Sequence, residues 1–469
     1  MDTTHALFKT QIIKLSTSYE KISPWQQPSS EPSHKNEDHT LWNHHVGNAL
    51  GVLLSNANYS LDVQRRNLDF FKQVVAPNLG IFQAMDGNRK PLWRSFMTDD
   101  GTPLELSWDW GTNNSQPTIR YSIEPIGAQA GTPFDPRNLL AGPALQEGLN
   151  QTLPGMRLET FHYFREFFLG HTEHKIIPYH GSSVLHRCLR FLDDFFAYEK
   201  GATRCSEGVQ DHSSSIFYAF DLTETGSTAK VYFFPKYRAQ LSMKSNLEII
   251  QEGIQGAPHC TPDNLHALSV FSDFSNDAAS KDLEYEMLAI DLVDPLQSRF
   301  KIYFRSRETS FDSLRRIITL GGRIEGGRIQ RGLRDLNCLW NAIFEVDAPP
   351  SHPLKEVNHR TAGMLYNVEF RIADRYPVAK VYLPVRHYSS SDDNVIKGLD
   401  HYFQSHQGGS YMASYRRAMD RLFGSESLRS QAGVQTYVGC TIRPDGALRI
   451  VSYFKPPLAD PIPPLEECV

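Results

Sequence analysis

The chain of 469 residues is long enough for one large domain or for two to three domains of ordinary size. Its 40% hydrophobic and 22% charged residues are typical of a folded globular protein and exclude a disordered chain. The 48 Lys and Arg residues against 53 Asp and Glu leave a net charge of −5, which excludes an overall positive field that would attract nucleic acid or an anionic membrane.

The N-terminal sequence contains no apolar run of signal-peptide length. No segment approaches the roughly 18 consecutive apolar residues of a membrane span. We therefore expect a cytoplasmic protein with no membrane partner. The six cysteines are scattered without a CxxC pair, which indicates reduced thiols rather than a zinc site or a disulfide framework.

In chain order, the first predicted feature is a polar, proline-containing stretch at residues 24–39, which we expect to be an exposed, flexible loop. The proline-rich end, residues 458–469, is expected to be a tail because proline continues neither a helix nor a central strand. Apolar residues spaced three and four apart predict amphipathic helices at residues 41–56, 60–77, 158–170 and 182–201.

Five segments with strand-like composition carry cationic residues at comparable places. They are IRYSIEPI with Arg120, AKVYFFP with Lys230, RFKIYFR with Arg299 and Lys301, AKVYLP with Lys380, and LRIVSYF with Arg449. Between Lys230, Lys301, Lys380 and Arg449 the successive separations are 71, 79 and 69 residues. This spacing fits a repeated unit of two helices and two strands.

Side chains along a strand point alternately to opposite faces, so the position of each residue assigns it to a face. In RFKIYFR, the residues Arg299, Lys301, Tyr303 and Arg305 share one face, and the apolar residues occupy the other. An antiparallel sheet with one face in water would explain a single such strand. Because a tyrosine recurs beside the cation and the helices need an apolar surface to cover, a closed barrel with a polar lumen explains the set better.

The same alternation places Glu105, Ser107 and Asp109 of PLELSWDW on one face. Several cations inside a barrel are costly unless an anion neutralises them, which predicts a polyanionic ligand. Tyrosine rings attract cations through their quadrupoles. Together these properties suit an allylic diphosphate that ionises to a carbocation and diphosphate.

The segments WRSFMTDDGTPLELSWDWG, IRYSIEPIG, AKVYFFP, SRFKIY, AKVYLP and YFKPP, in this order, resemble the fungal dimethylallyltryptophan synthase family of aromatic prenyltransferases. The resemblance implies an α+β fold, the ABBA barrel, in which ten antiparallel strands are ringed by helices in repeated α-β-β-α units. It implies one domain over residues 40–457, after an N-terminal segment 1–39. It also implies prenyl transfer with no required metal or other cofactor.

The resemblance assigns roles to individual residues. The diphosphate-binding set is Arg120, Lys230, Arg299, Lys301, Lys380 and, less securely matched, Arg443. The tyrosines expected to shield the allylic cation are Tyr232, Tyr303, Tyr382, Tyr437 and Tyr453. Glu105 matches a carboxylate that accepts the indole N–H and makes the ring more electron-rich.

One position departs from the family. Phe217 stands where members that prenylate tryptophan carry a lysine thought to remove the ring proton. Either another group or water removes the ring proton, or the acceptor differs from free tryptophan. We expect dimethylallyl transfer to an aromatic carbon of an indole alkaloid or indole diterpene. A phenolic polyketide acceptor, a longer prenyl diphosphate, and a noncatalytic barrel that carries an isoprenoid or anion are the alternatives.

The sequence offers no pattern for a metal site. The acidic pairs at residues 99–100, 193–194 and 392–393 lack the third carboxylate of a magnesium–diphosphate motif and are interpreted as turn or helix-surface charges. The expected partners are dimethylallyl diphosphate and an aromatic acceptor, with no nucleic acid, and the expected assembly is a monomer or homodimer.

Overall fold

The computed structural model describes residues 32–82, 93–111, 115–153, 155–170, 214–224, 226–406 and 411–458. Nearly all of them belong to one compact unit, made of residues 39–172 and 209–469. The predicted domain limits at residues 39 and 458 stay predictions.

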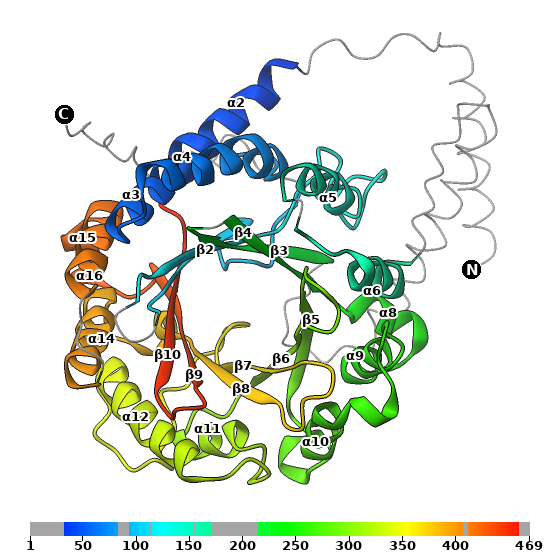
Figure 1. Ribbon diagram of the computed structural model, residues 1–469. Helices are drawn as coiled ribbons and strands as arrows, with labels where there is room; N and C mark the ends of the chain where they lie inside the picture. The colour runs from blue at the N-terminus through cyan, green and yellow to red at the C-terminus, as the bar shows by residue number, and fades with distance from the viewer. Residues whose placement is uncertain are drawn as a thin grey trace, which may run out of the picture. The chain divides into compact units, whose positions relative to one another are not determined.

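Ten strands in this part of the chain form a closed barrel, and each is antiparallel to both of its neighbours (Figure 1). Successive strands are paired throughout, and β1 closes the barrel by pairing with β10. The strands are β1 (Leu104–Asp109), β2 (Thr118–Ile123), β3 (Ile216–Thr223), β4 (Gly226–Phe233), β5 (Glu284–Asp291), β6 (Phe300–Ser306), β7 (Met364–Phe370), β8 (Val378–Leu383), β9 (Gln435–Ile442) and β10 (Leu448–Phe454). The predicted ten-stranded antiparallel barrel is confirmed.

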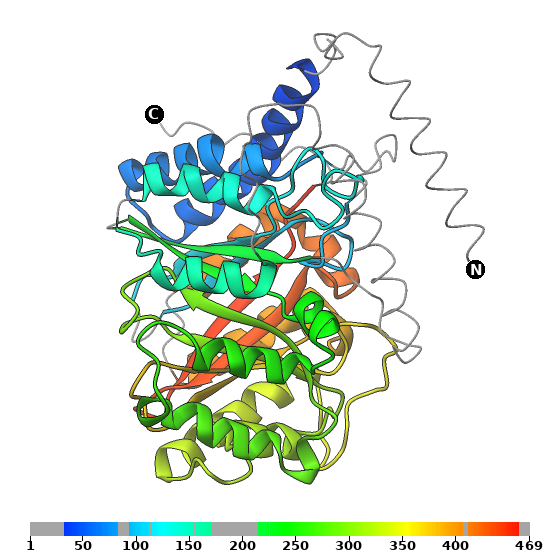
Figure 2. The same ribbon diagram turned by 90° about the vertical axis from the view of Figure 1, so that its right-hand side faces the viewer.

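Helices surround the ring of strands and separate its strand pairs along the chain (Figure 1). Figure 2 shows the same helices lying along the outside of the strands. The α-helices are α2 (Pro32–Trp42), α3 (Asn48–Asn56), α4 (Leu61–Phe70), α5 (Ala141–Thr152), α6 (Glu159–Leu169), α8 (Lys236–Ser242), α9 (Asn246–Gln255), α10 (His266–Ser275), α11 (Phe311–Ile318), α12 (Gly327–Phe344), α13 (Val385–Tyr388), α14 (Asp392–His406), α15 (Met412–Phe423) and α16 (Ser425–Ser430). The π-helical turns are η1 (Asn43–Gly47) and η2 (Phe71–Val75), and the 3-10 turns are η3 (Ala76–Asn78), η4 (Pro262–Asn264) and η5 (Ala278–Ser280).

The helices predicted at residues 41–56, 60–77 and 158–170 are confirmed, whereas 182–201 lies outside the described residues. The loop predicted at residues 24–39 is wrong for its second half, because α2 begins at Pro32. Proline is tolerated in the first turn of a helix, where its missing N–H has no intrahelical partner to lose. Among the described helices, none is both long and apolar enough to cross a bilayer.

The two faces of the barrel belong to two separate apolar clusters. On β6, the outward Phe300 and Phe304 pack on Phe164 of α6 and Phe271 of α10, with ring centroids 6.1 and 5.6 Å apart. The inward Tyr303 belongs instead to a small cluster of residues inside the barrel. The alternation read from the sequence therefore separates a helix-covered face from a luminal face.

Candidate active site

Six cations from five of the strands and their ends gather on the luminal face, and four carboxylates lie between them. We call the cations the cationic ring: Arg120, Lys230, Arg299, Lys301, Lys380 and Arg449. The carboxylates are Asp109, Asp221, Asp291 and Glu369. Because the cations outnumber the carboxylates, the ring keeps an excess of positive charge.

Asp221 joins two members of the ring. Its Oδ2 lies 2.6 Å from Lys230 Nζ, and its Oδ1 lies 3.2 Å from Arg120 Nε. Arg120 also contacts Asp109, whose Oδ2 accepts a hydrogen bond from Arg449 Nη2 at 2.6 Å. Burial alone would raise the pKa of Asp221, but Lys230 and Arg120 together hold that pKa well below its usual range.

Asp291 organises the neighbouring part of the ring. It contacts Lys301 and accepts from Arg299 Nε at 2.7 Å, while Arg299 Nη1 reaches Glu369 at 3.3 Å. Burial lowers the pKa of Lys301 to about 8 in spite of the Asp291 carboxylate. These pairs explain how the lumen holds so many cations. From the sequence we expect a bound anion to neutralise the cations, but carboxylates on neighbouring strands already compensate most of them.

Lys380 differs from the other members of the ring. Its Nζ donates to the Tyr453 hydroxyl at 3.0 Å and lies 4.3 Å from the centroid of the Tyr382 ring. Within the described residues no carboxylate forms an ion pair with it. Burial and the nearby Arg120 lower the pKa of Lys380 to about 7.

Arg443 does not join the ring. It follows β9 in a tight turn closed by Gly446, which has a φ of 88°, and it pairs with Asp445 at 3.0 Å. A cavity of about 980 Å³ opens at this end of the barrel and is lined by Arg443, by residues 324–329 and by the luminal Asp109, Glu369 and Arg449.

Five tyrosines form the next level of the lumen, which we call the tyrosine layer: Tyr232, Tyr303, Tyr382, Tyr437 and Tyr453. The rings of Tyr232, Tyr303 and Tyr382 follow one another with centroids 5.7 and 5.9 Å apart. Asn367 Nδ2 donates to the Tyr382 hydroxyl at 3.1 Å, which in turn donates to the Tyr303 hydroxyl at 3.2 Å. The faces and edges of these rings make this level of the lumen mostly apolar and electron-rich.

Glu105 lies beyond the tyrosine layer. Along β1 the inward residues are Asp109, Ser107 and Glu105, and Ser107 is directly opposite Tyr453 of β10. The Glu105 carboxylate accepts from Thr436 Oγ1 at 2.7 Å. Burial raises the pKa of Glu105 to about 7, so this group can exchange a proton near neutral pH.

Two β-bulges deliver polar side chains to this end of the lumen. The pairing of β9 with β10 skips Thr436, and the pairing of β5 with β6 skips Glu286. Each extra residue interrupts the alternation, which allows Thr436 to reach Glu105 and Glu286 to accept from Arg305 Nε at 2.9 Å. Strict alternation could not assign either residue.

Phe217 is buried on the luminal face of β3, opposite Tyr232. Its ring meets that of Phe234 edge-on, with centroids 4.8 Å apart. Phe234 in turn lies 6.0 Å from Phe96. These three rings form an apolar wall that offers no proton acceptor.

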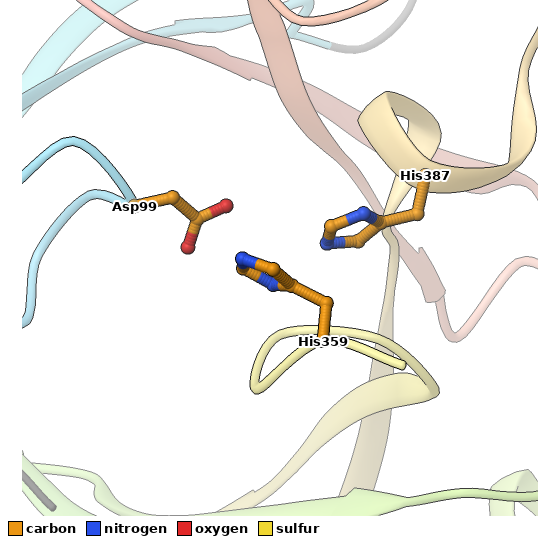
Figure 3. Close-up of side chains that lie close together, drawn as sticks. All are labelled: Asp99, His359 and His387. Carbon is orange, nitrogen blue, oxygen red and sulfur yellow. The ribbon is translucent and has the colours of Figure 1, made fainter. Parts of the chain in front are cut away.

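Near Glu105 lies a group of polar residues that we call the polar cluster: Asp99, His359, Arg360, Thr361, Arg386 and His387. Figure 3 shows the Asp99 carboxylate and the imidazoles of His359 and His387 directed toward one another. Asp99 lies in a turn, as expected, but its side chain is only 10% exposed and pairs with two arginines.

The polar cluster contains three groups of metal-ligating type, but their centre is filled. The Thr361 hydroxyl lies 2.7 Å from His387 Nε2, 2.9 Å from His359 Nδ1 and 3.2 Å from Asp99. The Asp99 carboxylate already neutralises guanidinium groups, so a divalent cation would be repelled here. This set does not fit a metal ion.

The luminal residues that sequence reasoning missed are Asp221, Asp291, Asn367 and Glu369, together with the bulge residues. The sequence signal for three of these residues is the alternation in EMLAID and LYNVEF. Asp291 lies two residues from the luminal Ala289, and Asn367 and Glu369 lie two and four residues from the luminal Leu365. Asp221 lies two residues from Ala219, which faces Lys230 across the strand pair.

Comparison with known proteins agrees with this architecture. The family model described as tryptophan dimethylallyltransferase matches residues 38–418. A 4-O-dimethylallyl-L-tyrosine synthase from Claviceps purpurea is 33% identical over 95% of this chain and 94% of its own length. A 7-dimethylallyltryptophan synthase from Aspergillus fumigatus is 30% identical over 88% of this chain and 84% of its own.

Among solved structures, AnaPT from Neosartorya fischeri superposes with a TM-score of 0.72, at 22% identity, over 90% of this chain and 94% of that one. At this identity the likeness supports the fold. The match of the family model over most of the chain and the two relatives decide the family. The chain belongs to the tryptophan dimethylallyltransferase family and is an aromatic prenyltransferase.

Proposed function

We propose that the protein transfers a dimethylallyl group from dimethylallyl diphosphate to an aromatic acceptor by electrophilic substitution, with no required metal. The observation that carries the proposal is the order of groups along the lumen. The cationic ring, the tyrosine layer and the Glu105 carboxylate follow one another on the luminal face, in the order that a diphosphate, an allylic cation and an acceptor need.

The cationic ring supports the first step. When the bond between the allylic carbon and oxygen breaks, its electron pair goes to the diphosphate, which gains negative charge. Lys230, Lys301 and Arg120 are held in place before the reaction and stabilise that charge without reorganising. Because cations outnumber carboxylates in the lumen, the protein's own side chains can stabilise the charge that develops on the diphosphate.

The tyrosine layer supports the second step. An allylic cation is captured by water unless water is excluded, and the ring faces of Tyr232, Tyr303 and Tyr382 offer it a negative quadrupole instead. A neutral phenol is also a much weaker nucleophile than a phenolate, and burial raises the pKa of Tyr303 and Tyr382 so that both hydroxyls keep their protons.

The acceptor is then expected to lie between the tyrosine layer and Glu105. The sequence interpretation favours an indole, whose N–H would donate to Glu105. A phenol satisfies the same geometry, and attack through its oxygen releases only the hydroxyl proton, which Glu105 can accept. Attack through carbon instead releases the proton of the attacked ring carbon, which needs a base beside that carbon, and the wall of Phe217 and Phe234 supplies none. The proton balance therefore favours a phenolic oxygen, with indole carbon as the second candidate.

A mixed panel tests the proposal. The protein is incubated with dimethylallyl or geranyl diphosphate and a set of indoles and phenols, with and without EDTA, and products are identified by mass spectrometry. We expect dimethylallylated products, formed at the same rate with and without EDTA. The rate of product formation should fall at least about 100-fold in Lys230→Ala and in Arg120→Ala. The exposed Lys244→Ala is the control. Full activity in both luminal variants would contradict the assignment, and binding without product would favour the noncatalytic carrier.

A further inference from the structure

Two segments singled out in the sequence, WRSF (residues 93–96) and EPIG (residues 124–127), meet at one buried carboxylate. Glu124 directly follows β2 and is only 1% exposed. The Trp93 indole donates to its Oε1 at 3.0 Å, and the Ser95 hydroxyl donates to its Oε2 at 2.5 Å. None of these residues belongs to the cationic ring, the tyrosine layer or the polar cluster.

A second serine links the same carboxylate to a third segment of the chain. Ser214, two residues before β3, donates to Glu124 Oε2 at 2.8 Å. The Ser214 hydroxyl also accepts from the Phe96 amide at 3.2 Å. The Ser95 hydroxyl accepts from the Met97 amide at 3.0 Å. The carboxylate and the two hydroxyls therefore hold two successive backbone amides in place.

One of these amides belongs to a ring of the apolar wall. The wall consists of Phe96, Phe217 and Phe234, and we call it the acceptor wall. The ring of Phe234 lies 6.0 Å from that of Phe96 and 4.8 Å from that of Phe217. The Phe234 amide donates at 3.2 Å to the carbonyl of Ser215, which adjoins Ser214. The serine network therefore holds the backbone of two of the three rings.

A purely structural role accounts poorly for this arrangement. No cation pairs with Glu124 in the part of the chain that the structure describes, and burial raises the pKa of its carboxyl to about 7. A buried carboxyl without a counter-ion is a costly way to stabilise a loop. A fully satisfied buried network does, however, restrict the residues that it joins to one conformation. Such precision matters in an active site, where a misplacement of about 1 Å can lower the rate about 100-fold.

We propose that Glu124 is a positioning residue for prenyl transfer: through Ser95 and Ser214 it holds Phe96, and with it the acceptor wall, where the acceptor is aligned with the allylic cation. The inference rests on the proposed prenyl transfer. In this role Glu124 contacts neither substrate and exchanges no proton with them. Loss of its carboxylate loosens the wall, so the acceptor binds more weakly and water captures more of the cation.

Replacement of Glu124 by Ala and by Gln tests this role. In Glu124→Ala we expect the KM for the best acceptor of the mixed panel to rise about 10-fold. The ratio of dimethylallyl alcohol to prenylated product should rise by a similar factor. The KM for dimethylallyl diphosphate and the calorimetric binding of inorganic pyrophosphate should not change, because no residue of the network belongs to the cationic ring. Glu124→Gln can accept from Trp93 and donate to both serines, so it should stay within about 2-fold of the native protein.

These readouts separate positioning from stability. Unfolded protein in a sample lowers kcat, but it changes neither a KM nor the ratio of two products formed in one active site. Asp393→Ala is the control. It removes a nearly buried carboxylate of α14, which pairs with Lys397 at 2.8 Å on the outside of the barrel. This variant should lose stability without a change in the acceptor KM or in the product ratio.

A double-mutant cycle with Phe96→Ala decides whether Glu124 acts through the wall. If it does, adding Glu124→Ala to Phe96→Ala should raise the acceptor KM less than about 2-fold further. Additive effects would overturn the inference, and so would a native acceptor KM and product ratio in Glu124→Ala. Ser95→Ala and Ser214→Ala each remove one link and replace Glu124→Ala in the test if that variant does not fold; a native KM in both would equally overturn it. Absence of any product from the native protein would instead contradict the proposed function.

Discussion

Asp221 lies between Lys230 and Arg120 and contacts both, at 2.6 Å and 3.2 Å. Arg120 is directly opposite it on β2, and Lys230 is on the strand that follows β3. The carboxylate therefore stands among the donors that the leaving diphosphate is proposed to use. We therefore expect Asp221 to stabilise the folded barrel and to compete with the donor substrate for these two cations.

Replacement of Asp221 by Asn separates these two effects. Loss of the carboxylate leaves buried cations uncompensated, so we expect the free energy of unfolding to fall by about 3 kcal/mol. The same change frees Lys230 and Arg120 for an anion, so inorganic pyrophosphate should bind more tightly and should restore stability as its concentration rises. Denaturant unfolding with and without pyrophosphate measures both.

The exposed Asp62, which pairs loosely with Arg65 at 3.8 Å, provides the control for this substitution. Asp62→Asn should change neither quantity. If Asp221→Asn weakened pyrophosphate binding, the carboxylate would be part of the donor site rather than its competitor.

Lys380 predicts how donor binding depends on pH. A lysine is charged below its pKa, and burial lowers the pKa of Lys380 to about 7. Only the charged form attracts a diphosphate, so kcat/KM for dimethylallyl diphosphate should fall as the pH rises through about 7. Arginine keeps its charge, so Lys380→Arg should move this decline to higher pH. Calorimetry in buffers of different ionisation enthalpy should also show proton uptake when pyrophosphate binds at pH 8.

Much of the barrel follows from alternation in the sequence. Lys301 and Tyr303 share a face with Lys230 and Tyr232 because successive side chains of a strand point to opposite faces. The predicted amphipathic helices provide the apolar surface that covers the other face. The repeat of strand pairs then predicts closure. None of these steps depends on knowing which strands are neighbours.

The pairing of charges, in contrast, depends on which strands are neighbours. Asp109 reaches Arg449 only because β1 closes the barrel against β10, which no local pattern specifies. The polar cluster joins Asp99 to residues near 360 and 387 through loops, and bulges turn Thr436 and Glu286 away from the alternating pattern. Loop paths and bulges follow from packing of the whole domain, so the end of the lumen that carries Glu105 is less predictable than the end that carries the cationic ring.

Tyr303 tests the tyrosine layer. It lies between Tyr232 and Tyr382, and its ring rather than its hydroxyl is expected to protect the cation. Tyr303→Ala should admit water and raise the ratio of dimethylallyl alcohol to prenylated product by about 10-fold. Tyr303→Phe keeps the ring and should leave this ratio close to that of the native protein. Chromatography of both products from one reaction measures the ratio, and an unchanged ratio in the alanine variant would remove the shielding role.

Phe217 tests the acceptor wall. Its buried ring packs edge-on against Phe234, so Phe217→Ala removes a contact as well as volume, and we expect the free energy of unfolding to fall by about 3 kcal/mol. The space left should admit larger aromatic acceptors, such as a tryptophan-containing cyclic dipeptide, with a lower KM than in the native protein. The KM for dimethylallyl diphosphate should not change, because Phe217 lies four residues along β3 from Asp221, the residue of this strand that contacts the cationic ring. Phe217→Leu, which keeps most of the volume, is the matched control. Steady-state kinetics with each substrate varied in turn distinguishes the two sites, and a rise in the KM for the donor in Phe217→Ala would show that the wall also holds the prenyl chain.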